Sequence, residues 1–368
     1  MHESEQRLKE RPGEAQDSVV EINLAMVGDV LLHYAVYEGA RVGDGFDFSH
    51  VFEHIAPELE GQDILAVSQE TILGGEDLGL GGYPLFNGPQ EMGDAEVEAG
   101  FNVVLRASNH ALDRGYEGLS SELSFWRERH PDVAVIGAVD PADPSTSVED
   151  VRIYEKNGFR VALLNYTYGL NGYEDPLGAV SMLEENHVRT TMAAARKRAD
   201  MMVVFPHWGK EYSLVPTQDQ RAWAKLFVDA GANLIVGAHP HVLEPVELLE
   251  GDGRTVPCFW SVGNFVSAQR QDQMLVGGMA KAVLRKEADG SCSVTSASLV
   301  PMVAHKNRGD PMATYLLRDW TDELAQTNYS IINLTWNTSL TVEWACEFCA
   351  QVLGPCFNRK AARLDLRL

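Results

Sequence analysis

Five short stretches of polar side chains each follow a run of apolar, β-forming residues, and they hold the residue types that carry out metal chemistry. In an open α/β sheet, ligands bind at the carboxyl ends of the strands, so these stretches are expected to meet at one edge of a sheet. The stretches are Gly28-Asp29, Gln69-Glu70, Ser108-Asn109-His110, Pro206-His207-Trp208-Gly209 and Ala238-His239-Pro240-His241.

Among their side chains are two carboxylates (Asp29 and Glu70), the amide of Asn109 and three histidines (His207, His239 and His241), which are oxygen and nitrogen donors suited to zinc, manganese or iron. The spacing His239-x-His241 is the most informative, because alternation in an extended segment would point both imidazoles to one side. The simplest interpretation is a centre of two metals about 3.5 to 4 Å apart, which needs a bridging carboxylate with donors on either side.

Each residue also has an ordinary structural explanation. Gly28-Asp29 can form a turn with an Asx cap, and Glu70 can be a solvated strand end. Asn109 can cap the helix that follows, and His207 can be a packed core histidine. The metal interpretation is preferred because all of these residues are expected at the same edge of the sheet.

The elements that position these residues alternate between β-rich runs and amphipathic helical patterns, which is typical of an α/β fold. Strands are expected at 22–27, 64–67, 103–105, 133–136, 161–165, 201–205 and 234–236. Helices are expected at 50–59, 95–99, 118–129, 187–198 and 218–230. After Cys258, strands at 259–262, 279–284 and 294–300 predict an added antiparallel layer.

The composition divides the 368 residues into three parts. Residues 1–18 are polar and lack periodicity, which predicts a disordered N-terminal tail. Residues 19–305 carry the α/β pattern, and residues 306–368 form a C-terminal appendage whose structure the pattern does not define. The appendage contains Cys346-x-x-Cys349 and Cys356, but it lacks the fourth ligand of a zinc site, so we interpret them as structural or free thiols.

The charge balance excludes some partners and constrains others. Thirty Lys and Arg against 53 Asp and Glu give a net charge of -23, which disfavours nucleic acid and also opposes an acidic polymer substrate. Any anionic substrate therefore needs a local cation.

The odd count of five cysteines argues against a disulfide framework. The N-terminal residues lack a signal-peptide core, and no stretch approaches the roughly 18 apolar residues of a bilayer span, so a cytoplasmic location is expected.

Six motifs follow one another along the chain: MVGDVLLH from Met26, SQETILGG from Ser68, SNHALDRG from Ser108, PHWGKEY from Pro206, GAHPHVLEPVE from Gly237 and WSVGNF from Trp260. In this order they resemble the bacterial capsule-synthesis proteins of the poly-γ-glutamate CapA type, whose domain is similar to the calcineurin-like metallophosphoesterases. The resemblance covers about residues 20–300. It implies a metallophosphoesterase-like α/β sandwich with mixed sheets.

The resemblance also implies a role for each polar residue. Asp29 is similar to the first metal-binding Asp, and Glu70 is similar to the carboxylate that bridges one or two divalent ions of Mn, Zn or Fe. His110 takes the place of the general acid, and Asp113 either orients that imidazole or favours the positive end of a helix. The further ligands would be Asn109, His207, His239 and His241.

The chain departs from the metallophosphoesterase pattern in the first motif. The histidine of the opening Asp-x-His is replaced by Leu31, so one metal site is expected to be weak or empty. His33 follows four residues after Asp29 and can substitute, or it can lie on a helix surface. Glu70 stands where the phosphoesterases have Asp, and its extra methylene alters the metal spacing.

Three charged residues lie beside the motifs in the sequence. Arg114 and Lys210 are candidate substrate-binding cations, with solvated surface charge as the alternative. Glu211 follows His207 by four residues and can orient it in the way proposed for Asp113 and His110.

The main hypothesis is a CapA-type capsule (poly-γ-glutamate) biosynthesis protein that acts as a metal-dependent hydrolase or transferase. Its target would be a phosphoester or acyl/amide bond in cell-envelope polymer metabolism, with an acidic polymer or a phosphorylated small molecule as substrate. A second hypothesis is a non-catalytic accessory or polymer-binding subunit that works with membrane capsule-synthesis proteins. A third is an amidase or transferase acting directly on poly-γ-glutamate. Relatives are often surface-anchored, so an extracytoplasmic, membrane-associated location is the alternative if an N-terminal anchor is missing.

Overall fold

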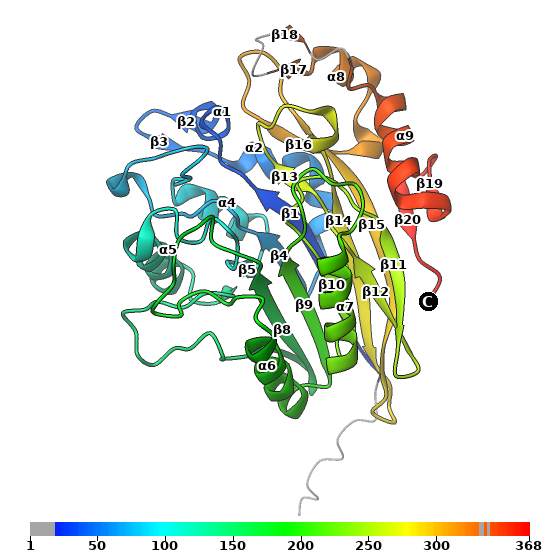
Figure 1. The fold of residues 1–368 in the computed structure, drawn as a ribbon. Helices are drawn as coiled ribbons and strands as arrows, with labels where there is room; N and C mark the ends of the chain where they lie inside the picture. The colour runs from blue at the N-terminus through cyan, green and yellow to red at the C-terminus, as the bar shows by residue number, and fades with distance from the viewer. Residues whose placement is uncertain (1–18, 331–334, 337–338) are drawn as a thin grey trace, which may run out of the picture.

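Two large mixed β-sheets pack face to face in the computed structural model, which describes residues 19–330, 335–336 and 339–368 (Figure 1). Helices cover the outer faces of the sheets. This is the α/β sandwich with mixed sheets that the sequence predicts. The tail expected at residues 1–18 lies outside the described residues.

The first sheet has the strand order β19-β20-β15-β14-β1-β4-β5-β6, with β13 beside β1 and β16 beside β15. It is mixed because β1 runs parallel to β4 and β13 but antiparallel to β14. Its strands are β1 (Val20–Val30), β4 (Ile64–Ser68), β5 (Val103–Leu105), β6 (Ala134–Ile136), β13 (Asn264–Val266), β14 (Val276–Lys286), β15 (Cys292–His305), β16 (Ala313–Leu316), β19 (Phe357–Asn358) and β20 (Arg363–Asp365).

The second sheet has the order β11-β12-β10-β9-β8-β7. Its inner strands β12, β10, β9 and β8 are parallel, whereas both edge strands are antiparallel to their neighbours. Its strands are β7 (Arg152–Lys156), β8 (Phe159–Thr167), β9 (Met201–His207), β10 (Leu234–Val236), β11 (Val246–Gly251) and β12 (Arg254–Phe259). Two small ribbons pair β2 (Arg41–Val42) with β3 (Gly45–Phe46) and β17 (Tyr329–Ser330) with β18 (Thr335–Trp336).

The helices begin and end close to the expected signals. The helix at 218–230 is held at its start by a capping box of Thr217 and at its end by Gly231, whose φ is 106°. The helix expected at 50–59 is broken into two short helices with a 3-10 turn between them, because Pro57 cannot donate an N–H to the preceding turn. The α-helices are α1 (Tyr34–Tyr37), α2 (Ser49–Phe52), α3 (Ala56–Leu59), α4 (Glu91–Glu98), α5 (Gly115–Arg129), α6 (Glu185–Arg198), α7 (Gln218–Ala230), α8 (Asp322–Thr327) and α9 (Val342–Leu353).

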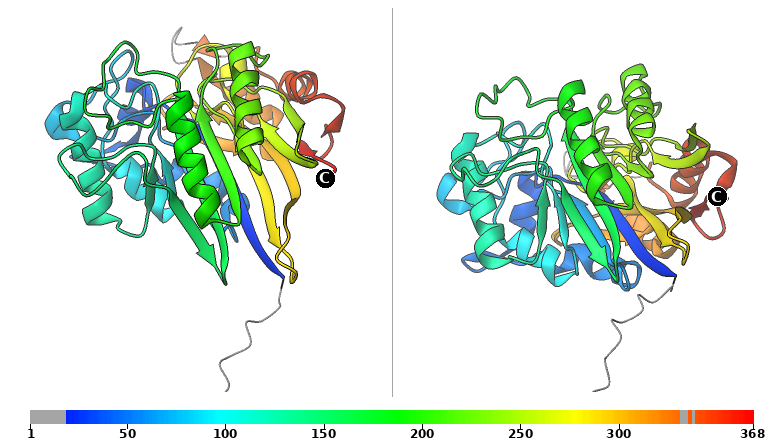
Figure 2. Two further views of the ribbon diagram at one scale, coloured as in Figure 1. Left: turned by 60° about the horizontal axis from the view of Figure 1, so that its bottom comes forward. Right: turned by 90° about the horizontal axis from the view of Figure 1, so that it is seen from below.

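Alternation along the parallel strands divides the core into two layers. In β8, Val161 and Leu163 point into the core between the sheets, whereas Ala162 and Leu164 pack in the cluster that contains α6 and α7. Figure 2 shows α6 and α7 lying side by side along this second sheet. A strand with both faces covered is apolar at every position, which explains the continuous hydrophobic runs of the sequence.

The chain after residue 251 differs from the expectation. The strand expected at 259–262 ends at Phe259, and β12 lies parallel to β10 within the second sheet. The later strands do not form an added layer, because β14 pairs with β1 along Val20 to Val27 and β15 pairs with β14. The difference arises because tertiary contacts decide which distant strands pair, and the alternation of apolar residues within one strand does not.

Within 306–368, the residues that the structure describes pack on the same core as the part of the chain before them. Leu364 of β20 lies opposite Leu299 of β15, and Trp320 and Phe348 are buried in the core between the sheets and their helices. Among the helices of the described residues, none combines the length and the apolar character needed to cross a bilayer.

Candidate metal centre

Both sheets contribute residues to one buried cluster at the carboxyl ends of their strands. Asp29 lies at the end of β1 and Glu70 two residues beyond β4, both in the first sheet. His207 is the last residue of β9 in the second sheet, and His239 and His241 follow β10. All five side chains are buried. The structure therefore brings together residues that are up to about two hundred positions apart in the chain, as a site at this edge requires.

The two oxygens of Glu70 face different histidines. Glu70 Oε1 lies 3.6 Å from His207 Nε2, whereas Glu70 Oε2 lies 3.7 Å from His241 Nδ1. Around these oxygens the donors form two groups that share Glu70: one is Glu70 with His207 and His239, and the other is Glu70 with Asp29 and His241. A shared carboxylate between two sets of donors is the geometry that a binuclear centre needs.

Burial leaves Glu70 without ordinary hydrogen-bond partners. Both of its carboxylate oxygens, and Nδ1 of His207 and of His239, are buried with no hydrogen bond. A buried ionised carboxylate without hydrogen bonds is costly unless a cation compensates it. The donor set of carboxylates and imidazoles therefore fits a divalent transition-metal ion.

Asn109 adds an amide oxygen to the group around His207. Its Oδ1 lies 2.7 Å from His207 Nε2, and its Nδ2 donates to Asn171 Oδ1 at 3.1 Å. Because the amide N–H group is occupied by Asn171, the oxygen is turned toward the histidine. The group of donors around His207 therefore contains one carboxylate, one amide oxygen and two imidazoles.

The electrostatics of the cluster favour cations. Burial alone would raise the pKa of Glu70, but His241 and His207 outweigh burial and hold it well below its usual range. Burial lowers the pKa of His241, but the charge of Glu70 and the hydrogen bond to Asp29 raise it to about 9. Burial and the neighbouring imidazoles lower the pKa of His239 well below its ordinary value. Glu70 is thus ionised, and His239 presents a neutral imidazole that can bind a metal.

Asp29 is oriented by two hydrogen bonds and by the glycine before it. Ser68 Oγ donates to Asp29 Oδ1 at 2.8 Å, and the backbone N–H of His239 donates to Asp29 Oδ2 at 3.1 Å. A Cβ at Gly28 would lie 1.8 Å from the carbonyl oxygen of Gly263, so β1 and β13 can meet here only if residue 28 is glycine. Gly28 therefore serves close strand packing directly beside a candidate ligand.

The two histidines after β10 do not lie in an extended segment, contrary to the expectation for His239-x-His241. Their φ values are 98° and 60°, both in the left-handed region, and residues 239–242 form a bend. Non-glycine residues rarely adopt such backbone, and strained positions of this kind gather at functional sites. The bend sends His239 toward one group of donors and His241 toward the other.

His110 and Asp113 form a hydrogen-bonded pair beside the cluster. His110 Nδ1 lies 2.6 Å from Asp113 Oδ2, which also accepts the backbone N–H of Phe86 at 2.7 Å. The other ring nitrogen, His110 Nε2, lies 3.8 Å from Glu70 Oε1. A carboxylate on Nδ1 fixes the ring with Nε2 directed toward the centre.

The remaining predicted residues lie around the cluster in different ways. His33 Nδ1 accepts the backbone N–H of Ala268 at 3.4 Å, and burial lowers its pKa to about 4. Arg114 donates to the carbonyl of Gly79 at 3.1 Å and so holds the neighbouring loop. Lys210 is exposed at the surface. Glu211 offers a carboxylate oxygen within 4.8 Å of donors on both His239 and His241.

A cavity of about 360 Å³ opens beside His110. Sequence patterns missed several of its residues, such as Asn171, which has a φ of 53° and lies in a loop without periodicity. Asn171 Nδ2 lies 3.3 Å from His110 Nδ1, so this loop contacts the His110–Asp113 pair directly. The cavity is lined by Tyr83, Pro84, Leu85, His110, Asn171, Gly172, Tyr173 and Glu211.

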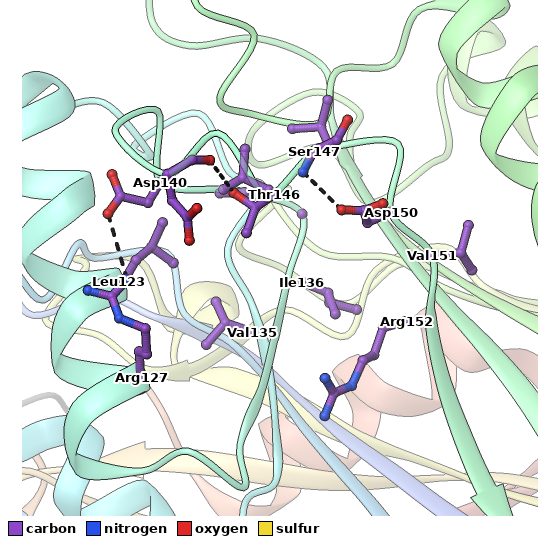
Figure 3. Close-up of a pocket in the computed structure, with 15 residues that line it drawn as sticks. Leu123, Arg127, Val135, Ile136, Asp140, Thr146, Ser147, Asp150, Val151 and Arg152 are labelled. Carbon is purple, nitrogen blue, oxygen red and sulfur yellow. Dashed lines mark hydrogen bonds and ion pairs between the residues drawn. The ribbon is translucent and has the colours of Figure 1, made fainter.

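Another cavity, of about 390 Å³, contains no residue of the metal cluster (Figure 3). It lies between α5, β6 and the loop that follows β6. Its polar groups bond to one another: Arg127 pairs with Asp140 at 3.8 Å, and the backbone N–H of Ser147 donates to Asp150 at 3.0 Å. Of these two cavities, the one beside His110 is the candidate site, because its lining residue His110 lies 3.8 Å from Glu70 of the cluster.

Comparisons with known proteins agree with the motifs. Residues 23–269 match the family described as bacterial capsule synthesis protein PGA_cap, and the chain belongs to this family. It is 31% identical over 261 residues to the capsule biosynthesis protein CapA of Bacillus anthracis, a match that covers 67% of this chain and 60% of that protein. It is 34% identical over 200 residues to the PGA biosynthesis protein CapA of Bacillus subtilis (strain 168), covering 53% and 50%. The expected resemblance to the CapA type is confirmed.

The chain thus spans 60% and 50% of the length of these two relatives. Among solved structures, the 5'-nucleotidase of Candida albicans SC5314 is similar with a TM-score of 0.41 and 14% identity, covering 73% of this chain and 52% of that one.

Proposed function

We propose that this member of the capsule synthesis family is a metal-dependent hydrolase that acts on a phosphoester or an acyl/amide bond in cell-envelope polymer metabolism. The observation that carries the proposal is Glu70, whose two buried oxygens have no hydrogen bonds and face two separate groups of donors. In this proposal Asp29, Glu70 and His241 hold one divalent ion. Glu70, His207, His239 and Asn109 hold the other.

The two ions would activate water and stabilise the charge that develops on a phosphoryl or carbonyl oxygen. The protein's own residues supply the remaining functions. Ser68 and the His239 backbone orient Asp29, so this ligand is held in place before substrate binds. The buried surroundings strengthen every charge interaction at the centre, because water screens it poorly there.

His110 is the proposed general acid. Its Nδ1–H donates to Asp113, which leaves Nε2 as the nitrogen that can deliver a proton to a leaving oxygen. The ring lines the cavity of about 360 Å³, so a leaving group in that cavity would be within its reach. A leaving oxygen that accepts this proton departs as a neutral alcohol, and His110 is left with its Nδ1–H bonded to Asp113.

An anionic substrate must overcome the charge of the protein. The net charge is -23, and Glu211 lines the cavity. Arg114 already donates to the carbonyl of Gly79, so it serves the loop and leaves the cavity without that guanidinium. We therefore propose that the bound ions supply most of the positive charge that a phosphorylated small molecule or an acidic polymer end requires, with Lys210 as an exposed cation nearby.

The proposal is tested by turnover with defined metals. The protein would be stripped, reloaded with Mn²⁺, Zn²⁺ or Fe²⁺, and assayed on bis(p-nitrophenyl) phosphate and on γ-glutamyl-p-nitroanilide. Glu70→Gln is expected to lose turnover of both substrates. His110→Ala should lose turnover of the anilide, whose leaving nitrogen needs a proton, and should change turnover of the p-nitrophenyl ester by only a few-fold. His187→Ala is the matched control and should keep turnover, because His187 lies on α6 and bonds Ser181 outside the centre. Metal-replete wild-type protein that is inert to both substrate classes would overturn the proposal.

A second candidate function is a non-catalytic accessory subunit of a capsule synthesis complex. It is favoured by Leu31, a buried apolar side chain where the metallophosphoesterase pattern has a metal-binding histidine. His110→Ala separates the two functions in cells that make capsule. Lost capsule with an intact complex supports catalysis, whereas normal capsule supports the accessory role.

A further inference from the structure

Asn264 lies directly beside the group of donors formed by Asp29, Glu70 and His241. It begins β13, which runs parallel to β1, and it is the register partner of Asp29. Its side chain is buried, and its Oδ1 lies 3.1 Å from His241 Nδ1. The residue belongs to the motif WSVGNF, to which the sequence pattern assigned no chemistry.

The orientation of the Asn264 amide is fixed by its other end. Asn264 Nδ2 donates to Gln269 Oε1 at 2.8 Å and to the carbonyl oxygens of Met274 at 2.9 Å and His241 at 3.3 Å. An amide nitrogen surrounded by three acceptors cannot exchange places with its oxygen without losing all three bonds. Oδ1 must therefore point at the metal cluster.

The spacing of these atoms matches that of ligands around one ion. Two ligands at about 2.1 Å from a metal lie about 3.0 Å apart when they subtend a right angle and about 3.4 Å apart in a tetrahedron. His241 Nδ1 lies 3.1 Å from Asn264 Oδ1, 3.3 Å from Asp29 Oδ2 and 3.7 Å from Glu70 Oε2. The nitrogen that faces Asn264 is thus the same nitrogen that faces both carboxylates.

The other half of the centre shows the same combination. There an amide oxygen, Asn109 Oδ1, lies 2.7 Å from His207 Nε2, and the histidine nitrogen again faces Glu70. For the ion site of Asp29, Glu70 and His241, the metallophosphoesterase pattern would place a histidine at residue 31, where this chain has a leucine. His33 does not belong to either group of donors, and its Nδ1 already accepts a backbone N–H.

We propose that Asn264 Oδ1 is a ligand of the ion held by Asp29, Glu70 and His241, in place of the histidine that Leu31 replaces. The inference rests on the proposed metal centre and extends it. Each ion is then bound by an amide oxygen, the shared carboxylate and imidazole nitrogen. The site of Asp29, Glu70 and His241 therefore needs no histidine at residue 31.

The test measures metal binding, which does not depend on turnover. Wild-type protein is expected to bind two equivalents of Mn²⁺ in calorimetric titration. Asn264→Ala should keep one equivalent and weaken the other by about ten- to one-hundred-fold or more, since loss of even an outer partner of a metal ligand costs this much.

Ser261→Ala is the matched control for a buried hydrogen bond in the same segment. Ser261 Oγ donates to the carbonyl of Val242 at 2.8 Å and accepts the N–H of Gly263 at 3.1 Å. Its removal should lower the unfolding temperature of metal-free protein but leave two equivalents of Mn²⁺. If Asn264→Ala behaves like Ser261→Ala, Asn264 is structural and the inference fails.

A crystal structure of wild-type protein with Mn²⁺ gives the answer without a variant. Anomalous scattering should place one ion within about 2.0 to 2.3 Å of both Asn264 Oδ1 and His241 Nδ1. An ion bound by His241 Nε2, with Nδ1–H donating to Asn264, overturns the inference but keeps the proposed centre. Protein that takes up no metal at all overturns the centre as well.

Discussion

Replacing Asp113 by Asn tests the proposed acid catalysis more sharply than removing His110. Asn keeps the size of the side chain, and an amide oxygen in the place of Asp113 Oδ2 can still accept both the backbone N–H of Phe86, at 2.7 Å, and the Nδ1–H of His110, at 2.6 Å. The amide oxygen carries no charge, however, so it stabilises a doubly protonated His110 ring less than the carboxylate does.

The size of the effect follows from the charge that this hydrogen bond loses. A short hydrogen bond to a charged group contributes about 1.5 to 3 kcal/mol. At about 1.4 kcal/mol for each tenfold change, kcat should fall by roughly ten- to one-hundred-fold or slightly more. The fall should be seen with an alkyl phosphoester, whose leaving oxygen needs a proton. With a p-nitrophenyl ester, whose leaving group departs as a stable anion, kcat should change by only a few-fold.

The assay is therefore a comparison of two substrates on two metal-loaded proteins. The occupancy of metal in Asp113→Asn must equal that of the wild type, so that a loss of kcat reports the proton and not the ions. An equal fall with both substrates would show that Asp113 supports the centre as a whole. No fall with the alkyl substrate would refute the role of His110 as the acid.

Two further predictions concern stability. Gly28→Ala places a methyl group 1.8 Å from the carbonyl oxygen of Gly263, so urea denaturation should show a loss of about 1 to 3 kcal/mol; an unchanged midpoint would show that β1 and β13 can separate. Burial raises the pKa of Glu244 to about 7 despite the Gln220 hydrogen bond, so its contribution to stability is present below about pH 4.5 and is lost as pH rises through 7. Relative to wild type, the free energy of unfolding of Glu244→Gln should therefore rise by up to about 3 kcal/mol between pH 4.5 and pH 8. The same difference from wild type at both pH values would refute the raised pKa of Glu244.

The sequence predicts most of the strands, and the polar residues that stand at their carboxyl ends, from local features. Continuous apolar runs define β1, β4, β9 and β10, and polar residues stand where each run ends. Asp29, Glu70 and His207 follow from this pattern alone, since parallel strands bring their carboxyl ends to one edge.

The features that the sequence does not reveal depend on contacts between distant segments. The spacing of His239 and His241 singles out two residues of the buried cluster, but their left-handed backbone follows from the bend that packs against β1. Asn171 lies in a loop without periodicity, so its contact with His110 has no local signal. Asn264 reaches the centre only because β13 is in register with β1, and this pairing joins residues more than two hundred positions apart.

The most direct test of the account is the metal stoichiometry of Glu70→Gln, because a single carboxylate shared by two ions is its central claim. Wild-type protein should bind two equivalents of Mn²⁺, and His207→Ala should weaken one of them. Glu70→Gln should weaken both equivalents together, since each group of donors contains one oxygen of Glu70. Two equivalents bound by Glu70→Gln with wild-type affinity would contradict the account.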